Sequence, residues 1–204
     1  GFLYPKVNQN TCINCSLCIK ACPILTPSKI ISEQRKAPIT YAALNKDDEV
    51  RFSSTSGGVF SALANYFYDN DGYVAGAIFL KDFTVTHIVS NERENLKKLK
   101  GSKYIQSYSG MIYNNIKALL DDRKQVLLCG TPRQVAGLFS ILGRSYDNLT
   151  TCDFICRGVG SPNIFRKYFE MLESEGRTTI NRIRFKDKTY GWHRFATRAE
   201  YSNG

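Results

Sequence analysis

The sequence predicts a protein of the α/β or α+β class, in which a small cysteine-rich module precedes a mixed α/β domain. Four cysteines fall between positions 12 and 22. From Ser53 onward, short apolar runs typical of buried strands alternate with stretches of helical periodicity. The chain has 204 residues, of which 43% are hydrophobic. This is enough for one domain with a core of its own, plus a small module.

The cysteine run has the spacing Cys12-x2-Cys15-x2-Cys18-x3-Cys22-Pro23, which bacterial ferredoxins use to bind [4Fe–4S] clusters. Two-residue gaps let consecutive sulfurs reach neighbouring irons of one cube. Residues 1–30 are too few for a core, so we expect a ferredoxin-like module organised by its cluster. Zinc sites usually pair two CxxC units over a longer gap, and no such pair is present.

More than one cysteine is a candidate for the fourth ligand of this cluster. In two-cluster ferredoxins the last cysteine of such a run binds the other cluster, so Cys22 would reach toward a second cube. The remaining ligands would then lie upstream of Gly1, giving two clusters in a longer protein. In a complete chain, Cys22 or one of the three later cysteines, Cys129, Cys152 and Cys156, would close the cube.

The net charge and the distribution of basic residues limit the classes of molecule that this chain is expected to bind. The chain carries a net charge of +10, but its basic residues are scattered and not interleaved with aromatic residues as in RNA-binding proteins. We therefore expect an anionic cofactor or an acidic redox partner and no nucleic acid. The sequence contains neither a signal peptide nor an apolar stretch long enough to span a membrane, so we expect a cytoplasmic protein. It starts without Met and stops after a strand-like stretch, which suggests a fragment.

After the module, residues 31–52 are polar and are expected to form a linker, with a strand at 39–44. Residues 53–204 are expected to form an α/β domain that binds FAD and substrate and is incomplete at its C-terminus. Its predicted helices begin at Val59 and Pro132 and cover 111–122 and 163–176. Its predicted strands cover 72–80, 84–90, 125–130 and 149–156, the last two buried, and a hairpin is expected from 180–187 and 193–201.

Several segments suggest a site for a phosphorylated cofactor. Thr131 and Pro132 begin a helix at the carboxyl end of a buried strand, where helix N–H groups attract anions in α/β proteins. Another helix start carries hydroxyls and glycines, and Lys103 adds a cation near a turn. Each signal is weak alone, because a Ser or Thr cap is usually only a cap. No GxGxxG or Walker motif is present. The expected cofactor-binding residues are Ser54, Thr55, Ser56, Gly57, Gly58, Lys103, Thr131, Pro132, Arg133 and Gln134.

Other reactive side chains are expected to have structural roles. Cys129 and Cys152 lie in apolar strands and are expected to be buried small hydrophobic residues. Cys156 lies beside a flexible loop and is the better candidate for chemistry. His87 is expected to point to solvent from its strand, and His193 to lie on the surface.

Taken together, these segments resemble the coenzyme F-420 hydrogenase/dehydrogenase beta-subunit family. The matching pieces are GFLYP, CINCSLCIKACP, SSTSGGVFSALANYF, GSKYIQS, VLLCGTPRQVAGL, DFICRGVGSP and INRIRFKDKTYGW. The resemblance implies an iron–sulfur flavoprotein oxidoreductase with an FAD site in the α/β domain. It also implies an organic acceptor, often a deazaflavin, and a hydrogenase- or dehydrogenase-type partner subunit. The alternative is a non-catalytic electron-transfer subunit that docks a partner enzyme.

The sequence departs from this family at two motifs. Family members commonly have Cys where Arg133 stands, and His and Pro where Arg157 and Gly160 stand. Arg133 places a positive charge at a helix start, which opposes the helix dipole unless an anion binds there. We therefore expect Arg133 to contact the cofactor phosphates.

Overall fold

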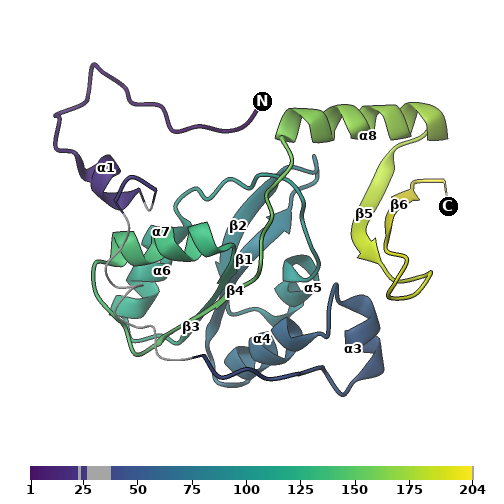
Figure 1. Cartoon of the computed structure of the whole chain (residues 1–204), viewed down its shortest axis with the longest axis horizontal. Coiled ribbons are helices and arrows are strands. Elements are labelled where there is room, and N and C mark those ends of the chain that lie inside the picture. Colours follow the sequence, from purple (N-terminus) through teal and green to yellow (C-terminus); the bar gives the residue numbers. More distant parts are fainter. Residues whose placement is uncertain (23, 27–37, 204) are drawn as a thin grey trace.

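The computed structural model describes residues 1–22, 24–26 and 38–203, and its centre is a four-stranded sheet (Figure 1). The strand order is β2-β1-β3-β4. β1 pairs with β2 in antiparallel orientation, whereas β1, β3 and β4 run parallel. The strands are β1 (Tyr73–Phe79), β2 (Val85–Ser90), β3 (Val126–Gly130) and β4 (Leu149–Asp153).

Helices cover both faces of this sheet, and the alternation of side chains along the strands produces two core layers. Leu127 of β3 faces the layer of α4 and α5, where it packs with Ala64, Phe67 and Leu99. Its neighbour Leu128 faces α6 and α7 on the opposite side. The covering helices are α4 (Val59–Asp69), α5 (Leu96–Leu99, preceded by a short 3-10 turn), α6 (Ile112–Asp121) and α7 (Pro132–Leu142).

The C-terminal part of the chain forms a separate layer beside the sheet (Figure 1). It consists of α8 (Pro162–Gly176) and an antiparallel hairpin of β5 (Ile180–Asp187) and β6 (Ala196–Tyr201). Phe169, Ile180 and Ile183 form its small core. Phe83, in the turn between β1 and β2, stacks on Phe169 with ring centroids 4.4 Å apart, which joins this layer to the sheet.

The hairpin expected between 72 and 90, the helices and the C-terminal hairpin are confirmed, but two expectations are wrong. Residues 39–44 form no strand and are exposed, while the expected linker contains a short helix, α3 (Asp48–Ser53). The stretch 149–156 is not a buried strand. β4 ends at Asp153 and is half-exposed, because it is the edge strand of the sheet and is covered less completely than β3. Of the linker, residues 31–37 lie outside the described residues.

Candidate functional site

A cavity of about 800 Å³ opens at the carboxyl ends of the parallel strands. Its floor comes from Gly76 and Ala77 of β1 and from Cys129 and Gly130 of β3, and its walls include the first residues of α4. Ligands of open α/β sheets bind at this position relative to the strands. The volume also lies within the roughly 300–1,000 Å³ that is typical of small-molecule and cofactor sites.

The structure brings most of the expected cofactor-binding residues to this one cavity. Two of the ten, Pro132 and Arg133, are not part of its lining, and both side chains are exposed. The helix starts near Gly58 and Thr131 therefore face a common space, although Arg133 does not. The lining members of the set are Ser54, Thr55, Ser56, Gly57, Gly58, Lys103, Thr131 and Gln134.

The start of α4 has polar groups without partners. Its N-cap is Gly58, which has a positive φ of 81° and supplies no side-chain hydrogen bond to the helix. Ser61, in the first turn of the helix, is only 2% exposed, and its hydroxyl oxygen has no hydrogen-bond partner among the described residues. Buried polar groups normally have partners, so Ser61 is available to a bound molecule. The free N–H groups of a first helical turn favour an anion.

The start of α7 is closed by its own side chains. Thr131 Oγ1 accepts a hydrogen bond from the Gln134 N–H, and Gln134 Oε1 accepts one from the Thr131 N–H at 2.9 Å, which completes a capping box. Gln134 Nε2 donates to Ser107 Oγ at 2.9 Å. These contacts explain the helix boundary expected from the sequence. They also leave fewer free donors than at the start of α4.

Lys103 is anchored to the backbone of its own loop. Its ammonium group donates to the carbonyl oxygens of residues 98, 99, 100 and 101, at distances of 2.8 to 3.2 Å. These contacts cap the C-terminal end of α5, where cations are favourable. Burial lowers the pKa of Lys103 to about 8. The residue thus fixes the loop that forms one wall of the cavity and adds positive potential there.

Sequence reasoning missed several residues of the cavity. His87 does not point to solvent, since it lines the cavity and its Nδ1 is buried without a partner among the described residues. Burial lowers the pKa of His87, so the imidazole is neutral at pH 7. The cations Lys100, Lys186 and Arg157 also line the cavity. No sequence pattern indicates that Lys100, which follows α5, lies beside the cavity. His193 lies on the surface as expected.

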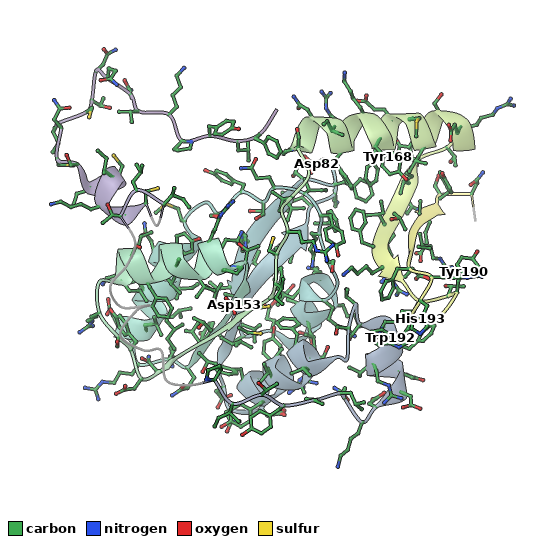
Figure 2. All side chains as sticks on the ribbon, viewed as in Figure 1. Asp82, Asp153, Tyr168, Tyr190, Trp192 and His193 are labelled. Atoms are coloured by element: carbon green, nitrogen blue, oxygen red, sulfur yellow. The ribbon has the colours of Figure 1, made fainter. Side chains whose placement is uncertain are left out.

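Lys188, in the C-terminal hairpin, anchors the loop from Ser54 to Gly58. The Lys188 ammonium donates to the carbonyl oxygens of Arg51 and Ser56, both at 2.9 Å, and lies 3.9 Å from the centre of the Trp192 ring. The side chain is almost fully buried. Figure 2 shows Trp192 and His193 at the end of the hairpin that lies next to α3. The shape of this cavity wall therefore depends on a distant part of the chain.

The cysteine run surrounds the short helix α1 (Leu17–Ala21), which packs near α7 (Figure 1). The thiols of Cys12, Cys15 and Cys18 are exposed and Cys22 is half-buried, while Pro23 lies outside the described residues. Asn14 and Ser16 have positive φ angles, 53° and 59°, which turn the backbone between consecutive cysteines.

The number, type and spacing of these thiols fit a [4Fe–4S] cluster. Among the described residues, no three His, Cys, Asp or Glu side chains are already arranged to hold a single metal ion. The four cysteines therefore stay a prediction as the cluster ligands, which rests on their chemistry and their order in the chain.

Gln106 ties the N-terminal segment to the cavity loop. Its side-chain amide donates to the Leu3 carbonyl oxygen at 2.8 Å and accepts from the Leu3 N–H at 2.6 Å. The Gln106 N–H donates to the Gly160 carbonyl oxygen at 3.0 Å. The segment that leads to the cysteines is thus linked, through one residue, to two loops beside the cavity.

Residues 5–25 match the 4Fe-4S binding domain, a span that contains all four cysteines of the run. Residues 40–112 match the family described as coenzyme F420 hydrogenase/dehydrogenase, beta subunit N-term. This match supports the resemblance to the beta-subunit family. No curated protein matches the chain. None of the described helices is both long and apolar enough to cross a membrane.

The segment that matches this family contains most of the residues that line the cavity. It covers the loop from Ser54 to Gly58, α4, the hairpin with His87, and Lys103, while Thr131 and Gln134 lie beyond it. A chain of the F420-reducing [NiFe] hydrogenase complex from Methanosarcina barkeri has a similar fold, with a TM-score of 0.50 and 18% sequence identity. The match covers 76% of this chain and 58% of that one, so our chain spans little more than half the length of this relative.

Proposed function

We propose that this chain is an iron–sulfur flavoprotein oxidoreductase subunit, with a [4Fe–4S] cluster on its cysteine run and FAD in the cavity. A bound flavin would exchange single electrons with the cluster and a hydride equivalent with an organic acceptor of the deazaflavin type. One observation carries the proposal. The hydroxyl- and glycine-rich loop, the start of α4 and the strand ends meet around one cavity of cofactor size.

The chain provides separate groups of residues for FAD and for the cluster. The N–H groups at the start of α4 and the Ser61 hydroxyl are placed to bind the pyrophosphate. Lys100 and Lys186 add positive charge to the same cavity. Arg133, exposed and outside the lining, is not part of this proposal. Cys12, Cys15 and Cys18 would hold the cluster, with Cys22 as its fourth ligand or as a ligand of a second one.

The proposal also concerns partners. The Methanosarcina barkeri relative belongs to a hydrogenase complex, so we propose that this chain acts with a hydrogenase- or dehydrogenase-type subunit. Its net charge of +10 favours an acidic docking surface on that subunit.

The test is a flavin titration of the anaerobically reconstituted protein. The wild-type chain should contain iron and labile sulfide and should bind FAD much more tightly than riboflavin, because only FAD carries the pyrophosphate. Ser61→Ala should weaken FAD binding about tenfold, which corresponds to one hydrogen bond of about 1.4 kcal/mol. The same change should not lower stability, because the hydroxyl has no hydrogen-bond partner in the part of the chain that the structure describes.

A matched control is Ser140→Ala. The Ser140 hydroxyl donates to the Ala136 carbonyl oxygen within α7 and does not line the cavity, so its removal should leave FAD affinity unchanged. If the protein binds iron but no flavin, the alternative of a non-catalytic electron-transfer subunit replaces the proposal. Zinc without labile sulfide would overturn the cluster assignment as well.

A further inference from the structure

Two cysteines outside the cluster run lie directly opposite each other on neighbouring strands. Cys129 of β3 and Cys152 of β4 are Cα partners in the parallel register. Neighbouring strands lie about 4.8 Å apart, and disulfides usually join Cα atoms about 4.4–6.8 Å apart. The Cα spacing of paired residues on neighbouring strands therefore lies within the range that a disulfide spans.

Both side chains also lie on the same face of the sheet. Leu127 faces the layer of α4 and α5, and Cys129, two positions later on the strand, faces the same way. Cys152 packs against this same layer. The expectation that both thiols are buried small hydrophobic residues is only half right, because each is partly exposed and Cys129 lines the cavity.

The pair is chemically asymmetric. The interaction between the two neighbouring thiols, together with burial, raises the pKa of Cys129, and the same interaction lowers the pKa of Cys152 to about 7. Cys129 thus keeps its proton while Cys152 supplies the thiolate, which is the form of cysteine that attacks disulfides. The nearby Lys103 ammonium lowers the pKa of Cys129, but burial and the neighbouring Cys152 raise it by more.

We propose that Cys129 and Cys152 form a redox-active dithiol that exchanges with small disulfides, which reach the partly exposed Cys152 on the edge strand β4. In the first step the Cys152 thiolate attacks one sulfur of the disulfide RSSR, which forms a mixed disulfide and releases one thiolate, RS⁻. In the second step Cys129 gives its proton to that thiolate and attacks the sulfur of Cys152. This forms the Cys129–Cys152 bond and expels the second RS⁻, which takes a proton from water.

The step is balanced, since the two protein sulfurs lose two electrons and RSSR gains them to become two thiols. It adds a two-electron couple to the chain that needs neither the flavin nor the cluster. Failure of the proposed function would leave this inference intact, and the reverse also holds.

The experiment treats the cluster-loaded protein with oxidised glutathione under anaerobic conditions. The reaction is stopped with acid, the remaining thiols are alkylated, and the peptides are analysed by mass spectrometry, with iron content measured in parallel. We expect a peptide pair linked through Cys129 and Cys152 and no loss of iron. The link should disappear on treatment with excess reduced glutathione.

Three variants separate the roles of the thiols. Cys129→Ser should lose the linked peptide and accumulate glutathione on Cys152, because the resolving thiol is absent. Cys152→Ser should lose both the link and the adduct. Cys156→Ser is the control, since it removes an exposed thiol outside the pair and should leave the link unchanged.

Separate glutathione adducts on Cys129 and Cys152 in the wild-type protein, with no link between them, would overturn the proposal. So would two unmodified thiols under conditions that modify Cys156. Both outcomes are read from the wild-type protein and do not depend on whether a variant folds.

Discussion

Substitution of Gln134 tests the energetic contribution of two contacts at the start of α7: the capping box and the hydrogen bond to Ser107. Its amide oxygen caps the Thr131 N–H and its amide nitrogen donates to Ser107, each at 2.9 Å. Gln134→Ala removes both contacts while keeping a good helix former at this position. Thr131 then loses its reciprocal partner, and the Ser107 loop loses its connection to α7.

The expected cost follows from these two contacts. Loss of a capping interaction costs about 1 kcal/mol, and a neutral hydrogen bond contributes about 1 kcal/mol net. Gln134→Ala should therefore lower the free energy of unfolding by about 2 kcal/mol, whereas Ser107→Ala should lower it by about 1 kcal/mol. The double variant should cost about as much as Gln134→Ala alone, because both changes remove the same hydrogen bond.

The assay is urea unfolding of the cluster-loaded protein, followed by far-UV circular dichroism. Equal m-values are needed for the comparison, since a changed slope would indicate a changed unfolded or native state. A loss of less than about 0.5 kcal/mol in Gln134→Ala, the range of ordinary surface substitutions, would refute the reasoning. Full additivity in the double variant would show that the bond between the two side chains contributes nothing.

Three further outcomes are expected. Gly58→Ala should destabilise the protein by about 1–2 kcal/mol through its positive φ alone, and more through a contact 3.0 Å from the new Cβ. Gly101→Ala, with φ of 82° and open space around it, is the matched control in the same unfolding assay. The free energy of unfolding should fall as the pH drops below about 6.5, because the unfolded chain takes up a proton that buried His87 resists. His87→Gln should flatten that pH dependence and His193→Gln should not, and an unchanged slope in His87→Gln would contradict the burial argument. Gln106→Ala should increase amide hydrogen exchange in the N-terminal segment, and unchanged exchange there would show that this contact does not hold the segment.

The parts of the fold that sequence could predict are those decided by neighbouring residues. The start of α7 was predictable because Thr131, Pro132 and Gln134 carry a complete local signal, and the structure contains the capping box. The cysteine run was predictable because its chemistry depends only on spacing. The hairpin of β1 and β2 was predictable from alternation on either side of a short turn.

The predictions that were wrong concern residues whose environment is set by contacts between segments distant in sequence. The alternation of residues along its strand predicts that His87 faces solvent. In the structure, however, the loop that contains Tyr108 lies along β2, where Tyr108 contacts Thr86, and covers His87. The stretch 149–156 is apolar enough for a central strand, but its place at the sheet edge depends on topology. The positions of Lys100 and Lys186 beside the cavity likewise depend on how distant segments meet.

Lys188 has a consequence for the order in which the chain folds. Its contacts with Arg51 and Ser56 join residues 137 and 132 positions apart, so they can form only after the hairpin and α3 have both been built. Contacts of such long sequence separation are the slow ones to close. The central sheet and its covering helices should therefore assemble first, with the loop from Ser54 to Gly58 still unanchored. During synthesis, the cavity reaches its final shape only when Lys188 has left the ribosome, so any cofactor that needs this loop is acquired late.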